Sequence, residues 1–227
     1  MSKIPVSIFC LWFICFTATK IQAQQVGTGS WNILHAQYHH SEKWSFFGEG
    51  QIRSLEFYNH FHYYELKGGI HYQMSKTMKI SLAAGTYQTY KEGGDFIHPK
   101  NNDEFRVWPQ IIFLQNENAL KIEQRYRAEL RFTTKGFKNR FRYRYGLSHP
   151  IFKKGKTPLT LSANNELFFT DVPPYFERNR MSVALNFKPN KNNNFQMGYV
   201  HQFDYKINDE TGKNLFMIGY FLDVYRK

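Results

Sequence analysis

The sequence predicts an all-β fold, a closed antiparallel up-and-down transmembrane β-barrel of about 10–12 strands. Three observations predict it. Charged and apolar side chains alternate along many segments, these segments are long for strands, and the chain begins with a segment typical of exported proteins. Together they indicate a sheet that closes on itself, carries its apolar side chains on the outside and holds its charges inside.

The clearest alternation lies in residues 120–132. Charged side chains occupy every second position, and all but one of the intervening residues are apolar or aromatic. Residues 140–145 repeat the pattern with three arginines. Successive side chains of a strand point to opposite faces, so a period of two residues predicts strands. The charged face of the first segment consists of Lys121, Glu123, Arg125, Arg127, Glu129 and Arg131.

Eleven segments are predicted as strands. Most of them run 11 to 14 residues, whereas strands of soluble proteins average about 5–6 and a tilted membrane strand needs about 9–11. Because single-chain bacterial barrels usually have an even number of strands, twelve is the expected count and ten the alternative. The segments are 28–40, 44–56, 61–74, 78–91, 104–114, 119–132, 139–151, 158–169, 178–188, 194–206 and 214–225.

The links between these segments alternate in length. One set is short and comprises 41–43, 75–77, 115–118, 152–157 and 189–192. The other set is longer, except for a short link around Asn59, and comprises 92–103, 133–138, 170–177 and 207–213. Short periplasmic turns and longer outer loops are typical of outer-membrane barrels. The link 92–103 is therefore the predicted surface for any partner contact outside the cell.

The N-terminus predicts export. Lys3 is followed by an apolar stretch, and Ala23 ends an acceptable cleavage site. Lys20 interrupts the stretch before it reaches the roughly 20 apolar residues of a spanning helix. We therefore expect a signal peptide at 1–23, one barrel domain at 24–227, and delivery to the outer membrane of a Gram-negative bacterium. Both cysteines lie within the signal, so the mature chain is expected to have no disulfide or thiolate chemistry.

Composition narrows the expected partners. The chain has 30 Lys and Arg against 18 Asp and Glu, and without Lys3 and Lys20 the mature excess is 28 against 18, or +10. Export argues against nucleic acid as the partner of this basic chain, and favours anionic solutes or a membrane surface. Phe, Tyr and Trp make up 22, 15 and 4 residues. Such aromatic content is typical of the belts that membrane proteins place at the two interfaces.

Arginine is concentrated on the polar strand face, which holds ten of the eleven arginines. Arginine suits bidentate pairing with carboxylates, and several glutamates share this face. The pattern predicts a water-filled or salt-bridged lumen with an excess of positive charge, which binds or passes small anionic solutes. The lumen-lining candidates are Arg53, Arg106, Glu123, Arg125, Arg127, Glu129, Arg131, Arg140, Arg142, Arg144, Glu166, Arg178 and Arg180.

Two resemblances extend this prediction. In the last segment, Gly219, Leu222 and Val224 resemble the assembly signal of outer-membrane barrels, which implies the barrel insertion machinery as a partner. The mature chain also resembles the uncharacterised outer-membrane β-barrel family called domain of unknown function 2490. The resemblance implies the barrel fold but no activity. It rests on GSWNI at 29–33, KWSFFGEGQIRS at 43–54, FHYYELKGGIHY at 61–72, EFRVWPQ at 104–110, KIEQRYRAELRF at 121–132, NRFRYRYGL at 139–147, YFERNR at 175–180 and GYVHQFDYKINDETG at 198–212.

Four alternatives remain open. The barrel could be closed and structural, with its outer loops binding a partner, or the chain could be a soluble periplasmic carrier resembling lipocalins. A lipid-modifying enzyme is less favoured, because the adjacent Ser148 and His149 face opposite ways on a strand. His60 and His62 have a spacing that can bind a metal, but their place at a strand start favours an ordinary interfacial role. We expect no enzymatic activity and no cofactor.

Overall fold

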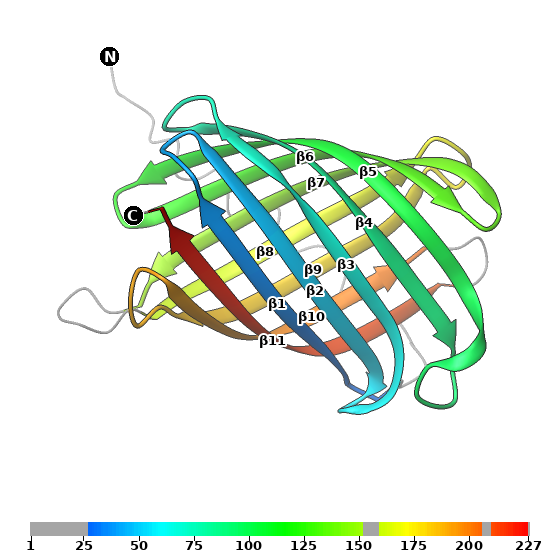
Figure 1. The fold of residues 1–227 in the computed structure, drawn as a ribbon. Helices are drawn as coiled ribbons and strands as arrows, with labels where there is room; N and C mark the ends of the chain where they lie inside the picture. The colour runs from blue at the N-terminus through cyan, green and yellow to red at the C-terminus, as the bar shows by residue number, and fades with distance from the viewer. Residues whose placement is uncertain (1–26, 152–158, 206–209, 227) are drawn as a thin grey trace, which may run out of the picture.

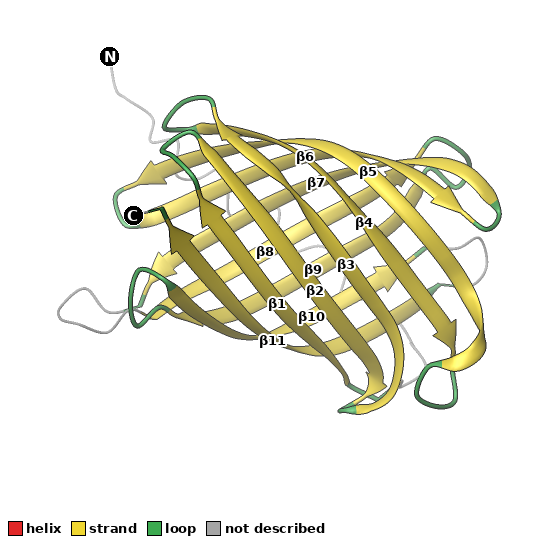
Figure 2. Cartoon of the chain, viewed as in Figure 1, coloured by secondary structure: helices red, strands yellow, loops and turns green. Residues whose placement is uncertain are grey.

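The computed structural model describes residues 27–151, 159–205 and 210–226, in which all regular secondary structure is β-strand (Figure 2). This described part contains no helix long and apolar enough to cross a membrane. The expected signal peptide, 1–23, lies outside it. The strands are β1 (Gly29–His39), β2 (Trp44–Glu56), β3 (Asn59–Gln73), β4 (Met78–Lys91), β5 (Ile97–Glu117), β6 (Leu120–Thr133), β7 (Gly136–Pro150), β8 (Leu159–Thr170), β9 (Phe176–Phe187), β10 (Asn193–Asp204) and β11 (Thr211–Tyr225).

The eleven strands of the described residues form one closed barrel, as predicted. Consecutive strands pair antiparallel, but β1 and β11 run parallel, with Gly29 opposite Leu215 and His39 opposite Tyr225. In Figure 1 the blue β1 and the red β11 lie side by side with their arrowheads at the same end. The expectations of an even strand count and of a wholly antiparallel barrel were therefore wrong. Each hairpin reverses the direction of the chain. With an odd number of strands, the first and last strands therefore point the same way.

The two ends of the barrel carry different links. The N-terminal rim, where β1 begins, has the links 57–58, 92–96, 134–135 and 171–175. The C-terminal rim, where β11 ends, has 40–43, 74–77, 118–119 and 188–192. The predicted contrast of short and long links is absent from these described links. Residues 97–103, expected in a long loop, continue β5, where Ile97 pairs with Lys91. The predicted link 152–157 lies outside the described residues, as do residues 207–209 of the predicted link 207–213. The end of that link was wrongly predicted, because β11 already begins at Thr211.

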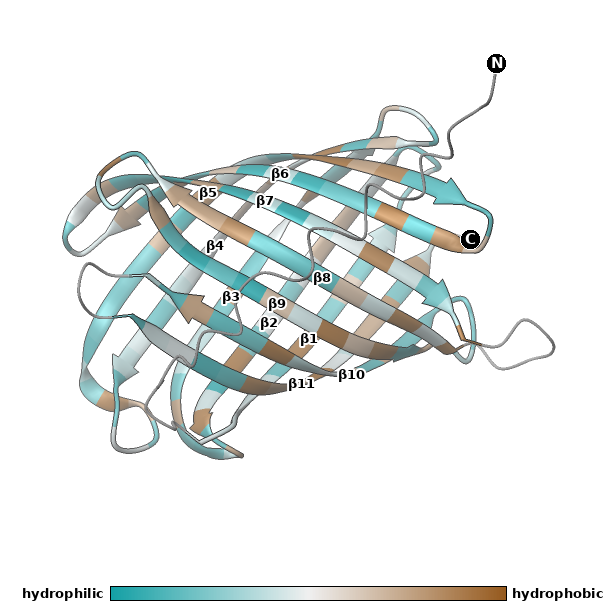
Figure 3. Cartoon of the chain, turned by 180° about the vertical axis from the view of Figure 1, so that it is seen from behind, coloured by the Kyte–Doolittle hydropathy of each residue, from teal (hydrophilic) through white to brown (hydrophobic). Residues whose placement is uncertain are grey.

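The predicted alternation of faces is confirmed along the strands. On β6, Arg125 and Arg127 turn into the barrel, while Tyr126 and Leu130 are exposed outside. Figure 3 shows hydrophilic and hydrophobic segments alternating along the ribbons. Buried apolar residues form two small clusters inside the barrel rather than one core. One contains Trp31, Ala184, Val200, Leu215 and Met217, and the other Ala83, Tyr87 and Trp108.

Small residues let the inner face of the sheet curve tightly. Gly198 on β10 lies opposite Ala184 on β9. A Cβ atom at Gly198 would stand 2.6 Å from the Cβ atom of Ala184 and 2.6 Å from the carbonyl oxygen of Val183. Gly69 faces Ala83 in the same way, at 2.4 Å. The opposing backbone of β9 or β4 cannot move away without shifting a whole strand, so both positions require glycine.

We expect Gly198→Val to destabilise the barrel by about 1–3 kcal/mol, because the added side chain overpacks against paired backbone. Equilibrium unfolding of the refolded protein in denaturant would measure the loss. The matched control is Gly48→Val, where a Cβ atom would have no neighbour within 4 Å. Equal stability of the two variants would contradict the role assigned to the Gly198–Ala184 contact.

Candidate functional site

An elongated cavity of about 1050 Å³ lies in the barrel interior. Its lining reaches from Arg53 and Asp204 near the N-terminal rim to Lys76 and Lys188 at the C-terminal rim. The lining contains sixteen Lys and Arg residues but seven Asp and Glu. The interior therefore presents an excess of positive charge.

The structure brings the predicted site residues together in this cavity. Glu129 alone is not part of the lining; it lies buried beneath the arginines, with 1 % of its surface exposed. The others line the cavity directly. They are Arg53, Arg106, Glu123, Arg125, Arg127, Arg131, Arg140, Arg142, Arg144, Glu166, Arg178 and Arg180.

The register between β6 and β7 places arginine directly opposite arginine. Arg125 faces Arg144, and Arg127 faces Arg142. Like charges in this arrangement repel and destabilise a sheet unless other groups neutralise them. The neutralising carboxylates come from elsewhere in the wall, so the network depends on a third strand and on diagonal neighbours.

Two buried carboxylates hold this wall together. Glu129 accepts hydrogen bonds from Arg140 Nη2 at 2.5 Å and Arg142 Nη1 at 2.6 Å. Arg127 and Arg106 place nitrogens 3.4 and 3.8 Å from the same carboxylate. A buried carboxylate is costly unless it is paired, and Glu129 has four guanidinium groups around it.

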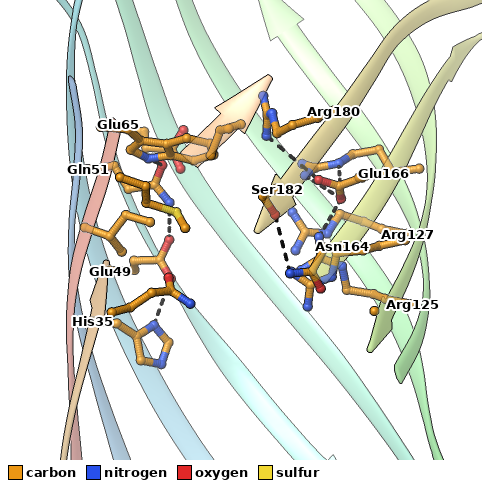
Figure 4. Close-up of a pocket in the computed structure, with 18 of the residues that line it drawn as sticks. His35, Glu49, Gln51, Glu65, Arg125, Arg127, Asn164, Glu166, Arg180 and Ser182 are labelled. Atoms are coloured by element: carbon orange, nitrogen blue, oxygen red, sulfur yellow. Dashed lines mark hydrogen bonds and ion pairs between the residues drawn. The ribbon is translucent and has the colours of Figure 1, made fainter. Parts of the chain in front are cut away.

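Glu166 on β8 also pairs with several arginines, nearer the centre of the barrel than Glu129. Its Oε1 atom accepts hydrogen bonds from Arg125 at 2.5 Å and from Arg142 at 2.8 Å. Arg180 on β9 approaches its other oxygen at 3.8 Å. Figure 4 shows Glu166, Arg125 and Arg180 on one wall, facing His35, Glu49 and Glu65 across the interior. Glu166 therefore links its own strand to β6, β7 and β9 by charge-assisted contacts.

The half of the interior next to the N-terminal rim is densely packed, and we call it the N-terminal layer. Guanidinium groups stack on aromatic rings, with Arg106 3.6 Å from the centre of Tyr87 and Arg53 3.9 Å from that of Trp31. Arg180 reaches from β9 to Trp31 on β1, at 4.9 Å. The layer consists of Trp31, Arg53, Glu65, Tyr87, Glu104, Arg106, Glu129, Arg131, Arg140, Phe168, Glu177 and Arg180.

Sequence reasoning missed Glu177. It lies 3.3 Å from Arg140 and 3.6 Å from Arg131, which places its carboxylate across β6, β7 and β9. Phe168 pairs with Arg178 but Phe169 pairs with Phe176, so Glu177 is the extra residue of a β-bulge. A bulge re-aims a side chain that strict alternation would point outward. No signal in the sequence marks this position as inward-facing.

The half next to the C-terminal rim is more open, and we call it the C-terminal chamber. Side chains there mostly contact neighbouring strands, as His35 does with Glu49 at 2.8 Å. Arg144 is paired with Glu123. The chamber and its mouth hold seven cations of the lining but two of its carboxylates. These residues are Lys67, Lys76, Lys79, Lys121, Arg125, Arg144, Lys188, Glu49 and Glu123.

Two buried donors in the chamber are not satisfied. The Nε atoms of Arg125 and Arg144 have no hydrogen-bond acceptor among the described residues. Both are cross-strand partners, so the two unsatisfied N–H groups belong to the same patch of wall. Leaving a buried charged donor unpaired is unfavourable. An anion in the chamber would remove this cost.

The candidates for other chemistry are separated. Ser148 lines the cavity, whereas His149 is exposed on the other face of β7. His62 lines the cavity, while His60 lies near Glu56 at 3.7 Å at the start of β3. Among the described residues, no group of three or more His, Cys, Asp or Glu side chains is arranged to hold a metal.

Comparisons with known proteins identify the family but not a function. No curated protein and no solved structure matches the chain significantly. One family model matches residues 28–213, which include ten complete strands and the start of β11. The resemblance predicted from the sequence is therefore confirmed, and the chain belongs to the family described as "Protein of unknown function (DUF2490)".

Proposed function

We propose that the mature chain is an integral outer-membrane barrel whose lumen binds and passes small anionic solutes. One observation carries the membrane part of this proposal. Apolar side chains such as Leu66 and Met197 are exposed on the outside, at 60 % and 56 %, while Arg140 and Glu166 are buried inside. A barrel surrounded by water would bury its apolar side chains and expose its charged ones. A surrounding hydrocarbon layer favours the observed arrangement, with apolar side chains outside and charges inside.

Two girdles of aromatic residues support a membrane setting. Near the N-terminal rim, Phe105 and Phe132 lie 6.4 Å apart between ring centres. Near the C-terminal rim, Phe113 and Tyr126 lie 6.2 Å apart. Phe113 follows Phe105 by eight residues, or about 27 Å along a strand. With a strand tilt of about 40°, this is ~20 Å along the axis, close to the ~25 Å apolar band of outer-membrane barrels.

The soluble carrier fits this arrangement poorly. A lipocalin-like carrier needs apolar side chains around its inner ligand, whereas the inner lining here is dominated by charged and polar residues. Export and the C-terminal assembly motif support the outer membrane as the destination. In that motif Val224 is exposed outside, as contact with lipid or with an insertion partner would require.

Anion selectivity follows from the charge of the lining. Rings of Arg and Lys favour anions in pores, and the surplus here is concentrated in the C-terminal chamber. The unsatisfied Nε atoms of Arg125 and Arg144 add two donors for an anion. We infer that anions enter this chamber and that the N-terminal layer limits their passage.

Planar-bilayer conductance in a salt gradient tests this function. We expect a reversal potential that reports anion selectivity, and we expect Arg125→Gln with Arg144→Gln to shift it towards zero. Arg226→Gln is the control, because Arg226 lies after β11 and off the lining. Cation selectivity would contradict the proposal outright.

A closed binding barrel is the second candidate. The observation that favours it is the pair of contacts that reach across several strands, Arg180 with Trp31 and Arg131 with Glu177. These contacts narrow the N-terminal layer. Chloride or acetate binding to the purified protein without any conductance would select this candidate over a pore.

A further inference from the structure

Four rings form a row along the wall of the C-terminal chamber. Phe47 stacks on His71 with ring centres 4.7 Å apart and on His35 with centres 5.7 Å apart. Phe221 continues the row beside His35 at 5.6 Å. The four rings come from β3, β2, β1 and β11, and each one lines the cavity. We call this row the ring ladder.

Local packing fixes the ring ladder in place. Phe47 packs against the buried cluster of Ala83, Tyr87 and Trp108. Beside Phe221, a Cβ atom at Gly219 would stand 2.6 Å from the ring, so the glycine makes room for it. The strands thus hold a strip of two phenylalanine and two histidine rings inside a lumen that is otherwise charged and polar. His35 and His71 also contact Glu49 and Ser81, whereas neither ion pairing nor lipid contact accounts for the inward-facing Phe47 and Phe221.

The ring ladder and the cationic wall lie on opposite sides of the chamber. The ladder is centred on β1 and β2, and Arg125 and Arg144 stand on β6 and β7, about halfway around the eleven strands of the described barrel. In Figure 4, His35 and Arg125 project towards the interior from the two sides. Lys79 on β4 stands between them and also lines the cavity.

We propose that the C-terminal chamber selects anions that carry an aromatic ring, with small aromatic carboxylates as the ligand class. The carboxylate is held by Arg125 and Arg144, whose Nε atoms supply unsatisfied donors. The ring of the ligand packs against the ring ladder, where edge-to-face and offset contacts between aromatic groups are favourable. This inference rests on the proposed anion-binding function and names its substrate class.

The test compares benzoate, acetate and benzyl alcohol as probes, with binding to the purified, detergent-solubilised barrel measured by calorimetry. We expect benzoate to bind about tenfold more tightly than acetate, from the ring contacts, and benzyl alcohol to bind more weakly than benzoate because it lacks the charge. Phe47→Leu should lower the benzoate affinity towards that of acetate and leave the acetate affinity unchanged. Phe46→Leu is the matched control, since Phe46 is exposed on the outer face of the same strand.

Each outcome decides one of the two proposals. Equal affinities for benzoate and acetate in the unaltered protein would overturn the inference and leave anion binding intact. If benzoate, acetate and chloride all fail to bind, the proposed function is overturned as well. If Phe47→Leu fails to fold, Phe221→Leu tests the other end of the ring ladder. If a folded Phe47→Leu or Phe221→Leu variant still prefers benzoate to acetate as strongly as the unaltered protein, the assigned role of the ring ladder is overturned.

Discussion

Val183→Arg is expected to destabilise the protein in a phospholipid bilayer by about 2–4 kcal/mol, the cost of a cation on the lipid face near the midplane of such barrels. Val183 lies on the outer face of β9, within the apolar band bounded by Phe176 and Phe187. An arginine there would lose hydration without gaining a partner. Equilibrium unfolding from vesicles in denaturant measures the change.

The chain offers a closely matched control for this variant. Val172, in the link 171–175 at the N-terminal rim, has 52 % of its surface exposed, against 53 % for Val183. The two valines therefore differ mainly in position along the barrel. Val172→Arg is expected to change stability by less than about 0.5 kcal/mol, as most surface substitutions do. Similar small effects at both positions would show that the outer face meets water, and would defeat the membrane proposal.

The fold could be predicted because alternation along a strand is a local property. On β6 and β7, the side chains that share a face are two residues apart, so the faces follow from the sequence without knowledge of any partner strand. The boundaries of β5 were predicted less well, because its polar residues 97–103 lie beyond the apolar band and resemble a loop. Such residues carry no periodic signal.

The strand count was misjudged for a different reason. Eleven segments were recognised correctly, and the expectation of an even number added a twelfth. Whether a meander closes by a parallel or an antiparallel seam depends on contacts between Gly29–His39 and Thr211–Tyr225, which lie at opposite ends of the sequence. No local pattern reports such a contact.

The partners of the site residues were also beyond prediction. That Arg125 and Arg144 face inward follows from the alternation of side chains along each strand. That they lie directly opposite each other depends on the register between the two strands. Register depends on turn geometry and on bulges, and the bulge at Glu177 shows how one extra residue changes a side chain's face. The ring ladder was overlooked because aromatic residues were assigned to lipid, although parity places Phe47 on the same face as Glu49.

Glu129→Ala is expected to cost about 3–5 kcal/mol of stability, the usual effect of removing one member of a buried ion-pair network. Four guanidinium groups surround this carboxylate, and Arg140 and Arg142 contact it at 2.5 and 2.6 Å. Without it, these buried cations would repel one another. Equilibrium unfolding in denaturant measures the change. Glu123→Ala is the control, because Glu123 is about one-third exposed and, among the described residues, forms an ion pair only with Arg144. Exposed pairs contribute about 1 kcal/mol or less.

The Glu129→Ala variant also tests whether the arginine wall accepts an added anion. The substitution removes a carboxylate and one methylene group, which leaves room for acetate among the same guanidinium groups. A ligand that binds only the folded state raises stability with its concentration, so acetate should restore part of the lost stability, and the uncharged acetamide should restore none. The Glu123→Ala control reports the stabilisation that acetate gives by binding at Arg125 and Arg144, and the restoration in Glu129→Ala should exceed it. A loss below about 1 kcal/mol, or equal restoration by acetamide, would show that Glu129 fills space rather than neutralising the wall.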